Sequence, residues 1–474
     1  MHKVLSRRQV MLAGVASAAF STLPNERASA TPARVLTVGS RTIEVNGKPA
    51  SVFAIEGADG ASGLVLAPGE RFTTSLVNRC GAPTIIHWHG QTPPVQQDGV
   101  TATGYETLVA DGAAQGYDFA ARPGTHWMHS HHGLQEQQLM AAPLIVHTAE
   151  DMRAHRQEVV VLLHDFTFKN PADILAGLTG ATSTGAAGGM MGGMGGMGSM
   201  GSMGGGTDLN DVDFDAYLAN GRTLDDPDVV KVAPGGQIRL RLINGATSTA
   251  FWIDTGAVQG QIIAVDGDPV RPISVGPFPL AEGQRADLLM TLPAGEGVYP
   301  ILARREGDRA QTGIILATPK ARVARLANVA DTPAGPCGVA LEVLLRATQP
   351  LGSRPVDRVV PVHLTGGMMG YDWGINGRQW QNHQPILVKQ GERVALDLIN
   401  DSMMSHAMHL HGHHFQVLAI NGDPLSGAMR DTVLVPPMGG VRIAFDAQNP
   451  GRWLFHCHNL YHMAAGMMTE LRYV

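Results

Sequence analysis

A turn followed by a strand that ends in asparagine occurs three times along this 474-residue chain, at the same spacing each time. The three copies run from Gly69 to Asn78, from Gly235 to Asn244 and from Gly391 to Asn400. Short alternating apolar runs surround them, and sustained helical periodicity is scarce. A unit repeated at this size predicts tandem copies of one fold. We therefore expect an all-β protein of three β-sandwich domains, at 31–150, 155–320 and 340–474.

The composition agrees with this class and excludes others. Charged residues make up 16% and the formal net charge is −6, which is too mild a balance for a nucleic-acid-binding protein. The 58 glycines and 5% aromatics suit many turns. Histidine and methionine are abundant, at 20 and 22, but three cysteines cannot form a disulfide framework. Cys80 and Cys337 either pair in an oxidising compartment or remain free thiols.

The first residues have the composition of an export signal. Ser6-Arg7-Arg8-Gln9-Val10-Met11-Leu12 opens an apolar run to Phe20, and Ala28-Ser29-Ala30 follows as a cleavage site. The alternative, a membrane anchor, is disfavoured because the run is far shorter than the roughly 20 residues of a spanning helix. We expect a twin-arginine signal peptide over 1–30, a periplasmic location and no membrane span.

Histidines occupy equivalent positions in the outer repeats as His-x-His pairs. The pairs are His87/His89 and His129/His131 in the first domain, and His409/His411 and His456/His458 in the third. The middle domain has Ile253, Thr255, Leu302 and Arg304 there, so we expect it to hold no metal. On a strand, alternation places both imidazoles of a pair on one face. Eight such imidazoles suit Cu, Zn, Fe or Ni, whereas chance pairing or neutral core packing would not repeat at matched positions.

The third domain adds a second constellation, His406, Cys457, His462 and Met467. Two imidazoles, a thiolate and a distant thioether are the ligands of a blue-copper electron-transfer site. Met467 alone would be a core methionine, but its place after Cys457 and His462 favours a ligand. The first domain has Thr84, Ser130 and Gln135 at the equivalent positions, with only Met140 retained, so we expect a single blue site.

These motifs resemble a known family. H-W-H-G at 87–90, H-S-H at 129–131, H-x-x-H-x-H-G at 406–412 and H-C-H-x-x-x-H-x-x-x-x-M at 456–467 are similar to the multicopper oxidases of the laccase type, and Tyr461-His462-Met463 to their periplasmic copper-resistance branch. The resemblance implies three cupredoxin-like Greek-key domains and four copper ions. It implies a type 1 copper on the blue-site residues, type 2 ligands His87 and His409, and type 3 ligands His89, His129, His131, His411, His456 and His458.

The resemblance also implies a proton-delivering acid, Asp98, although an aspartate before glycine is equally typical of a turn. Some bacterial members carry a further acid directly after the last type 1 histidine, where this chain has Met463. A second proton route through that position is therefore not expected.

The implied activity is one-electron oxidation of a small reducing substrate, either Cu(I) or a phenolic compound, coupled to four-electron reduction of O2 to water. A glycine-rich insert at 188–206 carries six methionines, and thioethers favour Cu(I). The alternative is that the insert is a flexible linker whose methionines bind nothing. The alternative function is a non-catalytic copper-storage or structural protein of the cell envelope. We expect a monomer that binds no nucleic acid.

Overall fold

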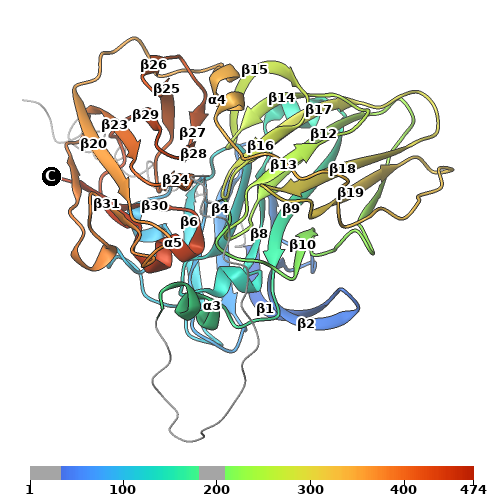
Figure 1. The fold of residues 1–474 in the computed structure, drawn as a ribbon, viewed down its shortest axis with the longest axis horizontal. Coiled ribbons are helices and arrows are strands. Elements are labelled where there is room, and N and C mark those ends of the chain that lie inside the picture. Colours follow the sequence, from blue (N-terminus) through green and yellow to red (C-terminus); the bar gives the residue numbers. More distant parts are fainter. Residues whose placement is uncertain (1–33, 181–208) are drawn as a thin grey trace, which may run out of the picture. The chain divides into compact units, whose positions relative to one another are not determined.

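The computed structural model describes residues 34–180 and 209–474, and strands dominate both ranges, which confirms the all-β prediction (Figure 1). The expected signal peptide at 1–30 and the insert at 188–206 lie outside the described residues. The few helices are short: α2 (Ala149–Arg153), α3 (Pro171–Leu178), α4 (Ala340–Leu344), α5 (Leu460–Ala465) and 3-10 turns at Val95–Gln97, Gln135–Gln138 and Trp380–Asn382.

The strands form six sheets, two in each of three successive stretches of chain. The first stretch has β2 (Lys48–Gly57), β1 (Arg34–Val45), β4 (Arg71–Asn78) and β6 (Ala114–Ala120) in one sheet, and β3 (Leu64–Leu66), β8 (Ala141–Val146), β7 (Gly124–Ser130) and β5 (Ile86–His87) in the other. The second has β10 (Ala216–Ala219), β9 (Gln157–Phe166), β12 (Gln237–Asn244), β17 (Arg285–Thr291), β14 (Gly260–Val265) and β15 (Asp268–Val275), then β11 (Val229–Lys231), β19 (Gln311–Ala317), β18 (Val298–Arg305), β13 (Phe251–Asp254) and β16 (Phe278–Leu280). The third has β21 (Gly374–Ile375), β20 (Arg358–Thr365), β23 (Arg393–Asn400), β29 (Gly440–Asp446), β25 (Phe415–Ile420) and β26 (Asp423–Pro424) with β27 (Met429–Arg430) beside β25, then β22 (Ile386–Val388), β31 (Met468–Tyr473), β30 (Arg452–Cys457), β24 (His406–Leu410) and β28 (Thr432–Val435).

The repeated asparagines explain why the three stretches fold alike. Asn78, Asn244 and Asn400 end the equivalent strands β4, β12 and β23. Each is buried, and its amide donates to two backbone carbonyls across the following loop while its oxygen accepts an N–H two residues on. The asparagine therefore satisfies the buried backbone where the chain leaves one sheet for the other. That connection leads directly to the first His-x-His position of each repeat.

Each pair of sheets encloses its own apolar core. Phe72 and Trp88 lie in the first core, Phe251 in the second and Trp453 in the third, all with 0% exposed surface. Alternating burial along strands such as β4 drives this pairing of sheet faces. Among the described residues, all three cysteines are unpaired, so Cys80 and Cys337 form no disulfide. No helix in residues 34–180 or 209–474 has the length and apolarity to cross a membrane.

Candidate metal centre

The four His-x-His pairs lie where strands end. In each pair the first histidine closes or nearly closes a strand and the second follows the last strand residue, on β5, β7, β24 and β30. Backbone hydrogen bonds continue past the last strand residue, since the N–H groups of His131, His411 and His458 still donate to carbonyls of neighbouring segments. The alternation of side chains holds for the residue between the two histidines of a pair, since Trp88 and Cys457 lie in the apolar cores of their own domains.

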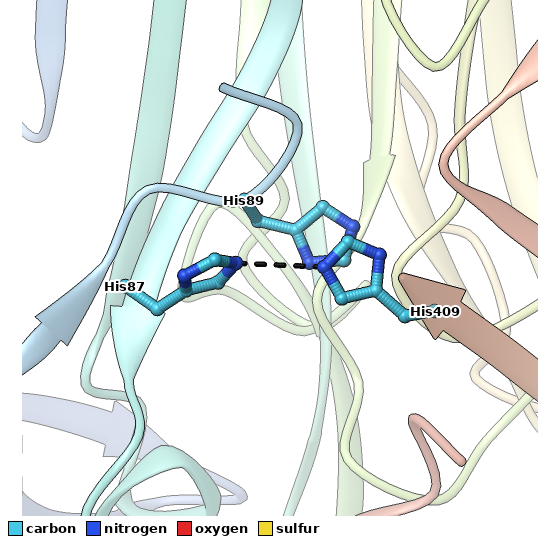
Figure 2. A group of neighbouring side chains, drawn as sticks. All are labelled: His87, His89 and His409. Atoms are coloured by element: carbon cyan, nitrogen blue, oxygen red, sulfur yellow. Dashed lines mark hydrogen bonds between the residues drawn. The ribbon is translucent and has the colours of Figure 1, made fainter. Parts of the chain in front are cut away.

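All eight imidazoles come together between the first and third stretches. Their ring nitrogens form three groups whose members lie within 4.8 Å of one another: His87, His89 and His409; His89, His129 and His458; His131, His411 and His456. Figure 2 shows the first group, in which the Nε2 atoms of His87 and His409 are 3.4 Å apart. The Nε2 atoms of His411 and His456 are 3.0 Å apart. Each group joins histidines of the first stretch to histidines of the third, so neither stretch alone forms the cluster.

Some ring nitrogens of the cluster are held by the protein, and others have no hydrogen-bond partner among the described residues. Nδ1 of His87, His409 and His456 each lies within 2.9 Å of a backbone carbonyl. Within the described chain, no hydrogen-bond partner exists for Nε2 of His129 and His131, Nδ1 of His89 and both ring nitrogens of His458. Buried ring nitrogens without hydrogen-bond partners, gathered at one place, are a donor set suited to a transition metal.

Burial sets the protonation of the cluster. It lowers the pKa of His129, His131, His411, His456 and His458 well below the ordinary value, and the neighbouring imidazoles lower each one further. These rings are therefore neutral at physiological pH. Metal ligation requires neutral imidazole, so binding does not have to displace protons from these rings.

The middle stretch contributes no imidazole to the cluster but supports it closely. Arg285 on β17 donates to both carboxylate oxygens of Asp431, at 2.7 and 2.5 Å. Asp431 in turn holds Nε2 of His89 at 3.0 Å through Oδ1 and Nδ1 of His409 at 2.9 Å through its carbonyl. Burial alone would raise the pKa of Asp431, but the charge of Arg285, together with His89 and the hydrogen bonds from Arg285 and His409, holds that pKa well below its usual range. Gly283 approaches so closely that a Cβ there would lie 2.8 Å from the His458 ring.

The second constellation forms a compact site inside the third stretch. Nδ1 of His406 and Nδ1 of His462 are 3.2 Å apart, and the Cys457 sulfur lies 3.7 Å from each. All three side chains have 0% exposed surface. Burial raises the pKa of the Cys457 thiol, so a thiolate needs a cation beside it. Met467 is fully buried in the same core, and its backbone bonds to both Cys457 and His462.

His462 is oriented by residues that spacing did not reveal. Asn459 caps α5, its side chain accepting from the N–H groups of Tyr461 and His462. The outer Nε2 of His462 lies 2.8 Å from the carboxylate of Asp211, which is fully buried. Asp211 also accepts from the Tyr371 hydroxyl at 2.6 Å. No local pattern marks Asp211, because its partners Tyr371 and Asn459 lie 160 and 248 residues away in the chain.

The first domain retains a polar replica of that site. Gln135 Oε1 accepts from the hydroxyls of Thr84 and Ser130, both at 2.8 Å. The Thr84 hydroxyl also lies 3.1 Å from the Met140 sulfur. The equivalent positions are therefore brought together, with hydroxyls and an amide that satisfy one another.

Asp98 lies against the histidine cluster. Its Oδ2 is 2.9 Å from Nδ1 of His411, and its Oδ1 is 3.4 Å from Nδ1 of His87. It is 1% exposed, and within the described residues Oδ1 has no hydrogen-bond partner. A turn aspartate would face solvent, so its position is that of a carboxylate in contact with two rings of the cluster. Met463 lines a cavity that His131 also reaches, and it places no acid there.

The two buried clusters adjoin in the chain, because Cys457 of one stands between His456 and His458 of the other. Family models described as multicopper oxidase match residues 37–151, 158–321 and 353–474, which together span most of the sequence. The chain belongs to the multicopper oxidase family. It is therefore an oxidoreductase that binds copper and uses O2 as acceptor, and its three domains are cupredoxin-like. Membership favours the oxidase over the non-catalytic alternative.

Curated relatives and solved structures agree with this membership. Multicopper oxidase MmcO from Mycobacterium tuberculosis (strain ATCC 25618 / H37Rv) is 33% identical over 414 residues, covering 86% of this chain and 80% of that protein. Copper resistance protein A from Escherichia coli is 28% identical over 564 residues, covering 92% of each. Among solved structures, Fet3p, described as a multicopper oxidase that functions in iron import, superposes with a TM-score of 0.74 at 19% identity and covers 93% of this chain and 90% of that one.

Proposed function

We propose that this protein is a periplasmic cuprous oxidase, with His406, Cys457, His462 and Met467 holding one copper and the eight clustered histidines holding three. The assignment is supported by the unpartnered ring nitrogens of the cluster and by the thiol that lies 3.7 Å from two imidazoles. When bound, copper supplies one-electron oxidation at the first site and four-electron reduction of O2 to water at the second.

The chain connects the two sites by covalent bonds. Cys457 belongs to the first site, and its neighbours His456 and His458 belong to the second. Paired strands fix this arrangement, because Met408 lies opposite Cys457 and His409 lies opposite His456 in β24 and β30. The backbone thus gives each electron a short route of bonds from the thiol to the histidine cluster. Asp98, against two rings of the cluster, is the group that we assign to deliver protons there.

Cu(I) is favoured as substrate by one loop beside His462. The loop from Gly366 to Trp373 carries Met369, which is 97% exposed, and Met368, which packs on the core of the third domain. The same loop places the Tyr371 hydroxyl on Asp211 and the Trp373 ring 4.2 Å from the His462 ring. Thioethers select Cu(I), and this pair belongs to the loop whose Trp373 contacts the His462 ring. Relatives named copper resistance protein A support the same substrate.

Replacing both loop methionines tests this proposal. In the double variant Met368→Leu, Met369→Leu, we expect oxygen uptake with stabilised Cu(I) to fall about tenfold, the effect of losing about 1.4 kcal/mol of binding. Leucine keeps the volume and removes the sulfur, so uptake with a simple phenol should not change. Met152→Leu is the matched control, since Met152 is 57% exposed and lies on α2.

Other outcomes separate the alternatives. An equal fall with both substrates would show that the loop has only a structural role. Fast phenol turnover with slow Cu(I) oxidation in the parent protein would make the enzyme a laccase. Deleting residues 188–206 tests whether the methionine-rich insert captures Cu(I). If it does, oxygen uptake in the same assays should fall with Cu(I) alone.

Export is tested separately from catalysis. The paired arginines Arg7 and Arg8 should direct the folded protein through the twin-arginine route. In a bacterial host, Arg7→Lys with Arg8→Lys should retain the oxidase in the cytoplasmic fraction, whereas the parent chain appears in the periplasmic fraction. Equal periplasmic amounts of the two proteins would refute the assignment of this signal.

A further inference from the structure

A second buried carboxyl lies on the loop that carries Asp98. Glu106 is 8% exposed, and its Oε1 accepts the N–H of Gly99 at 2.5 Å. Gly99 follows Asp98 directly in the chain, so the hydrogen bond from the Gly99 N–H links the Glu106 carboxyl to the residue next to Asp98. Only glycine fits at this position, because a Cβ on Gly99 would lie 1.8 Å from the Ile86 carbonyl oxygen and the Gly99 φ is +79°.

Several polar atoms around these acids have no partner. Asp98 Oδ1, Thr103 Oγ1, Glu106 Oε2 and the Tyr117 hydroxyl are all buried, and none makes a hydrogen bond within residues 34–180 and 209–474. Tyr117 on β6 faces the Glu106 carboxyl. Buried polar groups are normally satisfied by the protein or by internal water, so four such atoms in one region indicate water between them. Water among carboxyls and a hydroxyl is a path for protons.

The surroundings of Glu106 adjust its proton affinity to neutral pH. Burial raises the pKa of Glu106 to about 7, the Gly99 N–H opposes that rise, and the negative charge of Asp98 adds to it. Arg452 on β30 donates to the Thr103 carbonyl of the same loop, and its charge is paired with Glu470. A carboxyl in this range both releases and recovers a proton readily at neutral pH.

Solvent comes close to the same loop. Ala102, between Asp98 and Glu106, lines a cavity of about 320 Å³ together with His131, Trp380 and Met463. Met463, the residue after His462, has no titratable group. Ala102 therefore brings the loop that carries Asp98 and Glu106 to the wall of this cavity.

We propose that Glu106 is a proton-relay residue that reprotonates Asp98 during O2 reduction. The reaction takes four electrons from the reducing substrate and four protons from solvent, and it converts one O2 into two waters. Each relayed proton leaves the Glu106 carboxyl, crosses the intervening water to the Asp98 carboxylate and is replaced on Glu106 from the solvent side. This inference rests on the proposed role of Asp98 but not on the identity of the reducing substrate.

Glu106→Gln tests the relay, because the amide keeps the oxygen that accepts from Gly99 but cannot pass a proton on. The fully reduced copper-loaded enzyme is mixed with O2, and reoxidation is followed by absorbance from pH 5 to 9. We expect reoxidation at pH 7 to slow about tenfold or more and the pH dependence centred near 7 to disappear. Anaerobic reduction of the blue absorption, copper content and thermal unfolding should not change. Glu106→Asp, which restores a titratable carboxyl, should recover part of the rate.

Two further variants keep the inference testable. Glu306→Gln is the matched control, since Glu306 has a pKa of about 7 from burial and accepts the Cys337 N–H in the middle domain. It should leave reoxidation and its pH dependence as in the parent enzyme. Tyr117→Phe should move that dependence to higher pH, because the hydroxyl lowers the pKa of Glu106.

Infrared spectroscopy gives a readout that needs no turnover. A protonated-carboxyl band that titrates with a midpoint near 7 should be absent from Glu106→Gln, in metal-free and copper-loaded protein alike. Parental reoxidation and an unchanged pH dependence in Glu106→Gln would overturn the relay. If that variant does not fold, an unshifted pH dependence in Tyr117→Phe would overturn it. Slow anaerobic reduction of Glu106→Gln would also overturn it, because the defect would then precede O2.

Discussion

Cys457→Ser is expected to abolish both the blue absorption and oxidase turnover while the fold survives. A serine hydroxyl cannot replace the Cys457 sulfur as a copper ligand beside His406 and His462. Without that sulfur, no copper-bound group remains to pass electrons through the backbone to His456 and His458. Turnover should fall by several orders of magnitude, because residues that act as one unit fail together. Burying a hydroxyl in place of the sulfur costs about 1–3 kcal/mol, which leaves a three-domain protein folded.

Visible absorption, copper content and oxygen uptake measure this result directly. Cys80→Ser is the control, because Cys80 is only half-buried and bonds to the Ala82 carbonyl, outside both clusters. It should remain blue and active. A blue, active Cys457→Ser protein would refute the assignment of the first copper site.

Arg285→Leu is expected to weaken both the fold and the histidine cluster. The guanidinium has 0% exposed surface and neutralises Asp431, with Asp266 close by. Its removal leaves buried carboxylates with too little positive charge, which costs about 3–5 kcal/mol of unfolding free energy. His89 and His409 lose a fixed partner at their outer nitrogens, and such losses weaken metal affinity about 10–100-fold.

Denaturant unfolding of the metal-free protein and spin-resonance spectra of the loaded protein test the two parts of this prediction. The signals of the histidine cluster should weaken while the blue site stays filled. Arg442→Leu breaks an ion pair with Asp397 whose members are 44% and 28% exposed, so its cost should stay within about 1 kcal/mol. If Arg285→Leu matched that control in stability and copper content, the buried arginine would have no role in the cluster.

The middle domain supports the metal centre although its own repeat lacks the histidines. Its sequence has Ile253 and Thr255 where the outer domains have histidines, and the prediction that it holds no metal rested on that difference. In the structure, Arg285 and Gly283 nevertheless press against the cluster, and Asp211, which lies between the second domain's first and later strands, fixes His462. Charge and close packing across an interface leave no periodic signal, so spacing could not reveal these residues.

Local spacing determined much about this protein from the sequence alone. The repeated Gly-to-Asn unit predicted three similar β-sandwiches, because each asparagine satisfies a loop within its own repeat. The His-x-His pairs and the order His456, Cys457, His458 predicted two linked metal sites, because ligands a residue apart stay close in any extended chain.

Only the tertiary structure decided which imidazoles face one another and which residues hold them. His87 and His409 approach to 3.4 Å although 322 positions separate them, and Asp431 reaches His89 over 342. Contacts of this kind depend on how whole domains pack. The ion pair between Arg285 and Asp431 becomes buried only when that packing is complete.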